Sequence, residues 1–175
     1  MHTAAMARAA QVKLMIFDVD GVLTDGGLYF GVEGESIKRF HVHDGQGIRL
    51  LQESGVATAI ITARQSPILL RRVADLGIHH VQQGIHNKLD AFEKLLEQTG
   101  LKPEVCGFAG DDIIDLPVLT RVGFAVGVPN GHPEVTARVH YVTQEPGGNG
   151  AVRNICDFIL RAQGNYDAAL EPFLS

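Results

Sequence analysis

The sequence lacks the features that direct a chain to a membrane, to nucleic acid or to an oxidising compartment. No apolar run approaches the roughly 18 residues that span a bilayer, and the run at 12–17 is shorter than a signal core. With 15 basic against 20 acidic residues, the chain has no broad positive field for a polyanionic backbone. Its two cysteines, Cys106 and Cys156, lack a metal-type spacing. We therefore expect a cytosolic protein with buried free thiols that binds neither nucleic acid nor a membrane.

Tryptophan is absent and charged residues make up only 20% of the chain, yet 45% of the residues are apolar, as in ordinary globular proteins. A length of 175 residues suits one domain with a full core. No internal repeat, linker or low-complexity tract divides the sequence. We predict a single domain over residues 1–175, with flexible tails at about 1–10 and 165–175.

Short apolar runs alternate with segments of helical spacing. The runs have the texture of strands buried on both faces of a parallel sheet, at 12–17, 56–61, 105–109 and 124–128. The helical segments are bounded by caps, glycines or prolines, at 47–54, 66–77, 89–99 and about 151–163. This order predicts an α/β fold: a doubly wound, mainly parallel sheet flanked by helices, with ligands at the carboxyl ends of the strands.

One segment breaks this alternation soon after the first predicted strand. Two β-like runs, 28–32 and 37–42, lie on either side of Glu33-Gly34-Glu35, which is the pattern of a hairpin with a short turn. Apolar residues fall on both faces of this hairpin, and an isolated hairpin is marginal in water. We expect the 28–42 hairpin to protrude and pack against a second subunit. Folding back on its own sheet is the alternative.

Carboxylates follow two of the predicted strands. Asp18 and Asp20 come directly after the first strand, and Asp111 and Asp112 follow the third, with Asp115 one helical turn on. Because neighbouring parallel strands end at the same sheet edge, these acids should form one pocket. Such carboxylates repel each other unless a cation offsets their charge, and hard oxygen ligands suit Mg²⁺, which shares its coordination with phosphate.

A hydroxyl and an ammonium complete the set. Thr62 ends the second predicted strand, and Lys88 begins a helix. Taken singly, Thr62 as a helix cap and Lys88 as a solvated charge are the ordinary interpretations. Together with the acids, Thr62 could orient a phosphate and Lys88 could neutralise it. Asp18 could attack phosphorus, while Asp20 could protonate the leaving oxygen and then activate water. These residues indicate phosphoryl transfer through an aspartyl-phosphate.

In sequence order these residues resemble the four motifs of the haloacid dehalogenase superfamily of phosphatases: Asp18-Val19-Asp20-Gly21, Thr62, Lys88, and Gly110-Asp111-Asp112 with Asp115. The resemblance implies that Asp18 is the nucleophile and Asp20 the general acid/base. It implies that Asp18, Asp111 and the backbone carbonyl of Asp20 bind Mg²⁺, with Asp112 and Asp115 in support. Val22 stands where many members carry Thr, which weakens one supporting hydrogen bond but not the assignment.

The chain leaves no room for the cap domain that most members carry. This capless layout, the hairpin, the stretch 40–45 and the segment 147–153 resemble the 3-deoxy-D-manno-octulosonate 8-phosphate phosphatase family of lipopolysaccharide precursor biosynthesis, from about 12 to 170. That resemblance implies a small phosphorylated sugar-acid substrate and a homotetramer assembled through the hairpins. It implies substrate contacts from Arg64, Gly148, Gly150 and Arg153, and a C-terminal tail that covers a neighbour's site.

Three alternatives remain at this point. Ala63 stands where the family generally has Gly, and His43 where it commonly has Arg, which leaves an N-acylneuraminate 9-phosphate phosphatase open. His41 and His43 share one face of the predicted strand and could bind zinc, although two ligands fall short of a closed site. A phospho-receiver signalling domain also uses Asp, Thr and Lys. There the acid pair comes first, whereas here Asp-x-Asp opens the chain, so the order favours the phosphatase.

Overall fold

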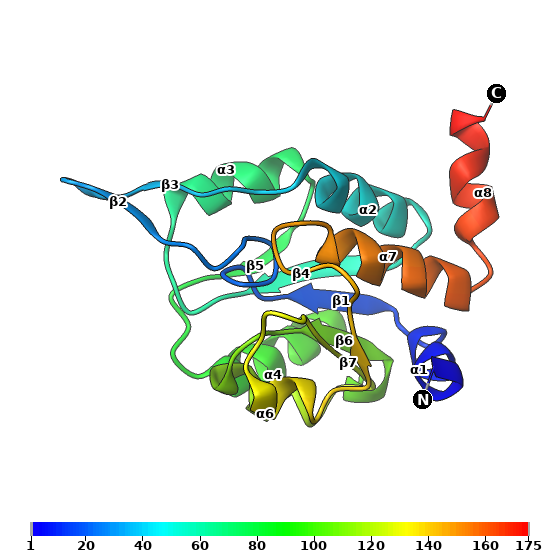
Figure 1. Cartoon of the computed structure of the whole chain (residues 1–175). Helices are drawn as coiled ribbons and strands as arrows, with labels where there is room; N and C mark the ends of the chain where they lie inside the picture. Colours follow the sequence, from blue (N-terminus) through cyan, green and yellow to red (C-terminus); the bar gives the residue numbers. More distant parts are fainter. Residues whose placement is uncertain (1, 175) are drawn as a thin grey trace.

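A six-stranded sheet forms the centre of the computed structural model, which describes residues 2–174. Its order is β5-β4-β1-β6-β7-β8, and every pairing is parallel (Figure 1). The strands are β1 (Leu14–Phe17), β4 (Ala57–Ile61), β5 (His80–Gln82), β6 (Cys106–Ala109), β7 (Phe124–Gly127) and β8 (Tyr141–Val142). The sequence predicted the four central strands. It missed β5 and β8 because these edge strands have only three and two residues and are half-buried.

Helices cover both faces of the sheet (Figure 1). One face packs against α2 (Val42–Glu53), α3 (Pro67–Asp75) and α7 (Ala151–Ala162), and the other against α4 (Lys88–Thr99), α5 (Leu116–Leu119) and α6 (Pro133–Thr136). Each face of the sheet has its own hydrophobic core, and alternate β1 residues contribute to each. Met15 and Phe17 pack in the core under α2, α3 and α7, and Leu14 and Ile16 pack in the core under α4, α5 and α6. Each such buried side chain contributes about 1.5–3 kcal/mol. This double burial is why the strands read as continuous apolar runs.

Helix α2 begins five residues earlier than its predicted start at Gly47, so Val42 belongs to a helix and the prediction of a strand up to this residue was wrong. Gly45 and Gly47 obscured the helix because glycine is a poor helix former. Their role is close packing: a Cβ on Gly47 would lie 3.1 Å from the Arg153 backbone of α7. Helices α3 and α4 begin close to their predicted starts. The side chains of Ser66 and Asn87 cap them by accepting backbone N–H groups.

The hairpin forms a separate two-stranded sheet of β2 (Tyr29–Gly31) and β3 (Gly34–Ile37), shorter than predicted. It projects from the body at the end where β1 finishes (Figure 1). Its large apolar residues are exposed by between 42% and 107%: Leu28, Tyr29, Phe30, Val32 and Ile37. The alternative in which the hairpin folds back on the central sheet is therefore wrong.

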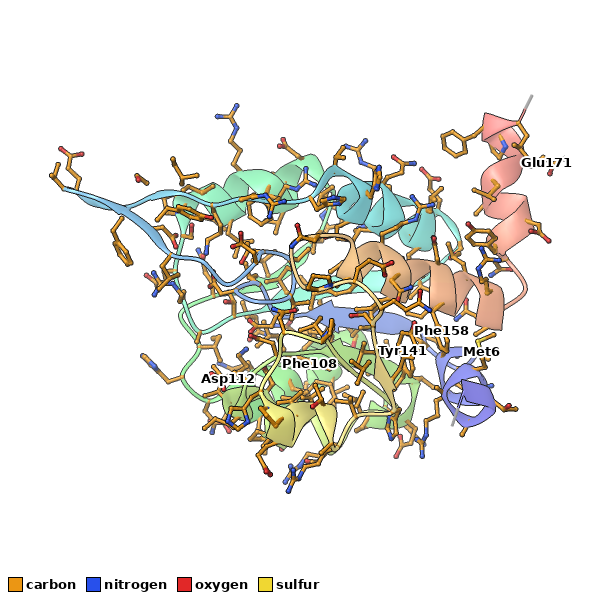
Figure 2. The ribbon with its side chains drawn as sticks, viewed as in Figure 1. Met6, Phe108, Asp112, Tyr141, Phe158 and Glu171 are labelled. Carbon is orange, nitrogen blue, oxygen red and sulfur yellow. The ribbon has the colours of Figure 1, made fainter. Side chains whose placement is uncertain are left out.

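Within residues 2–174, both ends of the chain are helical. We expected a loose N-terminal tail, but α1 (His2–Ala9) packs against α7 and buries Ala5 and Ala9, so that prediction is corrected. Near it, the Tyr141 and Phe158 rings stack with centroids 4.2 Å apart and hold β8 beneath α7 (Figure 2). Two 3-10 turns, η1 (Pro103–Val105) and η2 (Ile113–Asp115), flank β6.

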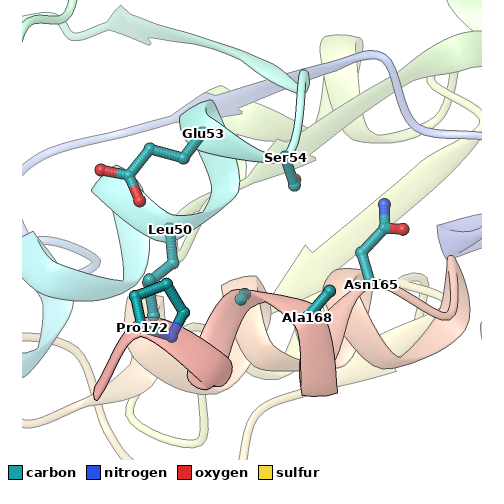
Figure 3. Close-up of a pocket in the computed structure, with 7 residues that line it drawn as sticks. Leu50, Glu53, Ser54, Asn165, Ala168 and Pro172 are labelled. Atoms are coloured by element: carbon teal, nitrogen blue, oxygen red, sulfur yellow. The ribbon is translucent and has the colours of Figure 1, made fainter. Parts of the chain in front are cut away.

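The C-terminal segment comprises α8 (Tyr166–Leu170) and η3 (Glu171–Phe173). It lies beside the end of α2, with a cavity of about 320 Å³ between them (Figure 3). This end of the molecule is opposite the hairpin (Figure 1), so α8 does not cover its own subunit's sheet edge. A role over a neighbour's site stays a prediction. Both cysteines are buried and free, as predicted. Within the described residues, no helix combines the length and apolar character needed to cross a bilayer.

Candidate active site

Three neighbouring strands deliver the predicted residues to one edge of the sheet. Asp18 follows β1, Thr62 follows β4, and Asp111 follows β6 after the single residue Gly110. The Asp18 N–H donates to the Ala109 carbonyl at 2.9 Å, which continues the β1–β6 pairing into the site. Both Asp18 and Thr62 are buried. Asp112 lies at this same edge (Figure 2). The structure thus brings Asp18, Asp111 and Asp115 together as the parallel topology predicted, whereas Asp20 and Asp112 lie outside this group.

Lys88 is the central cation of the cluster. Its Nζ lies 2.9 Å from Asp18 Oδ2 and 2.5 Å from Asp115 Oδ1. All three side chains are at most 7% exposed, so the interpretation of Lys88 as a solvated surface charge is wrong. Burial acts to lower the pKa of Lys88, but the charges of Asp18 and Asp115 outweigh burial and raise it. The ammonium therefore stays charged at neutral pH.

Asp115 fixes the loop that carries Asp111. Its Oδ2 accepts the backbone N–H groups of Asp111 and Asp112 at 3.1 and 3.2 Å, while Oδ1 contacts Lys88. A Cβ on Gly110 would lie 2.6 Å from Asp115, so glycine is needed for this close approach. Asp112 is exposed and caps η2 by accepting the Ile113 N–H at 2.7 Å. Both oxygens of Asp115 are thus already engaged.

The electrostatics of the cluster favour a bound cation. Burial, together with the charge of Asp115, raises the pKa of Asp18 to about 6. Burial and the charges of Asp18 and Asp115 raise the pKa of Asp111 to about 7. Carboxylate oxygens of Asp18, Asp111 and Asp115 lie within 4.8 Å of one another, and Asp18 Oδ1 is buried without a hydrogen-bond partner. One ammonium does not balance three carboxylates, and a divalent metal ion fits the remaining oxygens of Asp18 and Asp111.

Asp20 lies in a second charged group at the base of the hairpin. One of its carboxylate oxygens forms an ion pair with Lys38, and the other lies 3.8 Å from Arg64 Nε. Lys38 also contacts Glu35 Oε1 at 3.2 Å. The sequence interpretation missed Lys38, because a lysine beside an exposed hairpin strand has the same pattern as a solvated charge. Only the folded path of the hairpin brings it to Asp20.

Two further residues that the sequence interpretation missed hold the turn after Asp20. Thr24 Oγ1 accepts the N–H groups of Gly21 and Gly26 and donates to the Val19 carbonyl, at 3.3–3.4 Å. Thr24 thus supplies a hydroxyl to the turn, while Val22 is buried in the core. Asn130 donates to the Gly21 carbonyl at 3.2 Å. Its position after β7, at the ligand-binding edge, was a usable signal.

Of the predicted substrate contacts, Arg64 and the glycine loop lie beside Asp20 or the turn that follows it, whereas Arg153 is engaged in another ion pair. The Gly148 N–H donates to the Val22 carbonyl at 3.0 Å, so its loop packs on the turn after Asp20, and Gly150 directly precedes α7. Arg64 lies beside Asp20, whereas the Arg153 Nε is paired with Asp157 at 2.7 Å.

The predicted histidine pair is also rearranged. His41 and His43 lie at the start of α2 with ring centroids 5.0 Å apart, not on a strand face. Among the residues described, Asp18, Asp111 and Asp115 form the one group suited to a metal, so the zinc alternative is not supported.

Comparisons with known proteins also point to phosphatases of the haloacid dehalogenase type. A sequence model of the haloacid dehalogenase-like hydrolase family matches residues 77–155. The 3-deoxy-D-manno-octulosonate 8-phosphate phosphatase of Escherichia coli is 49% identical over 164 residues, which cover 94% of this chain and 87% of the relative. The 3-deoxy-D-manno-octulosonate 8-phosphate phosphatase of Moraxella catarrhalis was solved in complex with a magnesium ion, a phosphate ion and KDO. Its structure aligns with this chain at a TM-score of 0.94 and 42% identity, covering 97% of each chain. A probable YrbI family phosphatase from Pseudomonas syringae has a TM-score of 0.97 at 47% identity, covering 99% of this chain and 98% of its own.

Proposed function

We propose that this chain, which belongs to the haloacid dehalogenase-like hydrolases and among them to the 3-deoxy-D-manno-octulosonate 8-phosphate phosphatase family, hydrolyses that sugar-acid phosphate to the free sugar acid and inorganic phosphate. The observation that carries this proposal is the buried cluster of Asp18, Lys88 and Asp111 at the carboxyl edge of the sheet. The likeness to a relative that holds magnesium, phosphate and the sugar product supports it. Likeness to phosphatases also argues against the receiver-domain alternative.

Magnesium is the cofactor that suits the donor set. Asp18 and Asp111, with the backbone carbonyl of Asp20, would hold the ion, since the oxygens of Asp115 are occupied by Lys88 and by backbone N–H groups. When bound, the ion supplies positive charge to the phosphate oxygens. Gly21 leaves the space for this arrangement, because a Cβ there would lie 2.0 Å from Asp111 Oδ2. Asp112 caps η2, which directly follows the Asp111 loop, by accepting the Ile113 N–H.

The first half of the reaction transfers the phosphoryl group to Asp18. A carboxylate oxygen of Asp18 forms the new bond to phosphorus while the bond from phosphorus to the sugar oxygen breaks. Asp20, in its protonated form, gives its proton to that leaving oxygen. Thr62 orients the phosphate, and the ammonium of Lys88 offsets the charge that Asp18 and the phosphate share.

The second half releases phosphate. Asp20, now a carboxylate, takes a proton from a water molecule that attacks phosphorus of the aspartyl-phosphate. The bond between phosphorus and the Asp18 oxygen breaks, which regenerates the Asp18 carboxylate and returns the proton to Asp20. The same side chain thus serves as acid and then as base. The Asp115 contacts hold Lys88 and the Asp111 loop in place through both halves.

The sugar body would lie on the open side of this edge. We assign Arg64, beside Asp20, to the anionic group of the sugar acid. Gly148 and Gly150, on the loop against the turn after Asp20, would border the sugar. Arg153 could take part only after leaving Asp157. The departures at Ala63 and His43 keep nine-carbon sugar acids as a second candidate substrate class.

The exposed apolar hairpin supports a homo-oligomer. Its five large apolar residues are exposed by between 42% and 107%, and a group of exposed apolar residues on one projecting element is typical of an interaction surface. We propose that the 28–42 hairpins pair with those of other copies, with a tetramer as the expected state. A neighbouring subunit would then border each active site, which would replace the missing cap.

The decisive test is a substrate panel. Phosphate release is measured from phosphorylated eight- and nine-carbon sugar acids with Mg²⁺, with excess EDTA, and with the Asp18→Asn variant. The proposal expects the highest kcat/KM for 3-deoxy-D-manno-octulosonate 8-phosphate and no turnover under the other two conditions. A preference for a nine-carbon substrate would redirect the assignment, and turnover in excess EDTA would remove the magnesium mechanism.

A further inference from the structure

A quartet of charges, in which only Lys38 is buried, lies at the base of the hairpin beside the site. It alternates anions and cations: Asp20, Lys38, Glu35 and Arg64. Lys38 is the most buried of the four, with a side chain only 2% exposed, against 19% for Asp20 and 11% for Glu35. A lysine pays a desolvation cost at such a site unless carboxylates surround its ammonium. The contacts of Lys38 with Asp20 and Glu35 must therefore offset the cost of its burial.

The contacts of Lys38 fix one side of the Asp20 carboxyl group. Lys38 is ion-paired with Asp20 Oδ1, and its second partner, Glu35 Oε1, lies 3.2 Å away. Glu35 is held in turn by Arg64, whose guanidinium lies 3.5 Å from it. Burial acts to raise the pKa of Glu35, but hydrogen bonds from Ser66 and Lys38, with the nearby positive charges, lower it. Glu35 is thus a fixed anion that holds the Lys38 ammonium against Asp20.

The other oxygen of Asp20 is left for chemistry. Arg64 Nε is 3.8 Å from Oδ2, which is too long for a hydrogen bond. Because Lys38 holds Oδ1, Oδ2 is the atom free to exchange a proton with the leaving oxygen or with water. General acid–base catalysis requires the carboxyl oxygen to lie within hydrogen-bond reach of that proton, and small misplacements lower the rate strongly.

We propose that Lys38 is a positioning residue for phosphoryl transfer, which orients the Asp20 carboxyl group through Oδ1 and is itself braced by Glu35. The hairpin that projects its apolar strands outward thereby contributes, immediately after β3, a side chain that organises the site. This inference rests on the proposed role of Asp20, but not on the identity of the sugar.

The test compares leaving groups. Lys38→Met, Lys38→Arg and the exposed control Lys94→Met are assayed with three substrates: the sugar-acid phosphate, an alkyl phosphate without a carboxylate, and p-nitrophenyl phosphate. Single-turnover rates of phosphoryl transfer to Asp18 are measured, so that the later hydrolysis step does not mask the effect. An alkoxide leaving group needs the proton of Asp20, whereas p-nitrophenolate leaves without one.

For Lys38→Met we expect the transfer rate to fall about 10- to 100-fold with both alkyl-type substrates and less than about threefold with p-nitrophenyl phosphate, within the range of acid catalysis. Lys38→Arg should restore part of the rate, and Lys94→Met should match the wild type. Equal losses on all three substrates would assign Lys38 a structural role. A loss confined to the concentration of sugar-acid phosphate needed for half the maximal single-turnover rate would make it a substrate contact, and either result overturns the proposal.

Folding is checked by circular dichroism for each variant. Should Lys38→Met not fold, Glu35→Gln provides the second test, because a looser Lys38 should give the same leaving-group pattern at smaller size. An unchanged pattern in a folded Glu35→Gln protein would count against the brace. The alkyl and aryl phosphates keep this test separate from the proposed function: if the wild type prefers another sugar phosphate, the comparison between the two leaving groups is unaffected.

Discussion

Asparagine in place of Asp111 should stabilise the metal-free protein at pH 7.5 and abolish its response to Mg²⁺. In the wild type, burial and the charges of Asp18 and Asp115 raise the pKa of Asp111 from 3.8 to about 7. Ionising this carboxyl therefore costs more in the folded chain than in the unfolded chain. The shift corresponds to about 4 kcal/mol at 1.36 kcal/mol per pH unit. Because the raised pKa of Asp18 reflects the same crowding of carboxylates, we assign about half of this, about 2 kcal/mol, to Asp111 alone.

The pH dependence has a definite sign. Since the folded pKa of Asp111 is raised, the folded state keeps a proton that the unfolded state has already lost between about pH 4 and pH 7. The stability of the metal-free wild type should fall as the pH rises through this window. The amide of Asp111→Asn does not ionise, so the advantage of the variant should be largest at pH 7.5 and shrink towards pH 4.5.

Thermal unfolding in EDTA, followed by circular dichroism, measures this difference. About 2 kcal/mol corresponds to a Tm about 4–8 °C higher for a chain of this length. Saturating Mg²⁺ should raise the Tm of the wild type and leave that of the variant unchanged. Asp112→Asn is the matched control, because Asp112 is exposed and its amide can still cap η2. A variant that is no more stable than the wild type in EDTA at pH 7.5, or whose advantage does not shrink at low pH, would refute this account of the site.

Three further outcomes follow from the site and the hairpin. Asp18→Asn should abolish phosphate release while the circular dichroism spectrum stays unchanged, because the amide is nearly isosteric but a poor nucleophile; measurable turnover would remove the covalent step. Excess EDTA should stop the wild-type reaction and added Mg²⁺ should restore it, and activity that survives chelation would argue against a metal site. Phe30→Asp should lower the mass measured by light scattering with size-exclusion chromatography, since Phe30 is 62% exposed on the hairpin; an unchanged mass would place the interface elsewhere.

The parallel topology explains why the clustering of Asp18 with Asp111 could be predicted from the sequence. A buried run followed at once by acids marks the carboxyl end of a strand, and such ends share one edge of the sheet. Asp18 and Asp111 therefore converge because β1 and β6 are neighbours. The cap residue of α3, Ser66, was equally readable, because capping is local in sequence.

Long-range contacts explain why the rest could not be predicted. Lys38 reaches Asp20 only through the path of the hairpin, and the pattern of an exposed hairpin gives no sign of a buried ammonium. The start of α2 was hidden by Gly45 and Gly47, whose low helix propensity is overridden by packing against Arg72 and Arg153. The N-terminal helix was missed because its contact with α7 uses small alanine side chains, which give a weak hydrophobic pattern.

Glycines determine the geometry of the site as much as the carboxylates do. A Cβ on Gly21 would lie 2.0 Å from Asp111 Oδ2, one on Gly110 would lie 2.6 Å from Asp115, and one on Gly147 would lie 1.8 Å from the Gly21 carbonyl. The turn after β1 and the loop before α7 therefore meet backbone to backbone, and the side chains of Asp111 and Asp115 lie directly against Gly21 and Gly110. This close approach is what forces the acids together against their mutual repulsion. The raised pKa values of Asp18 and Asp111 are its electrostatic consequence, and a bound cation is the means by which the folded chain relieves it.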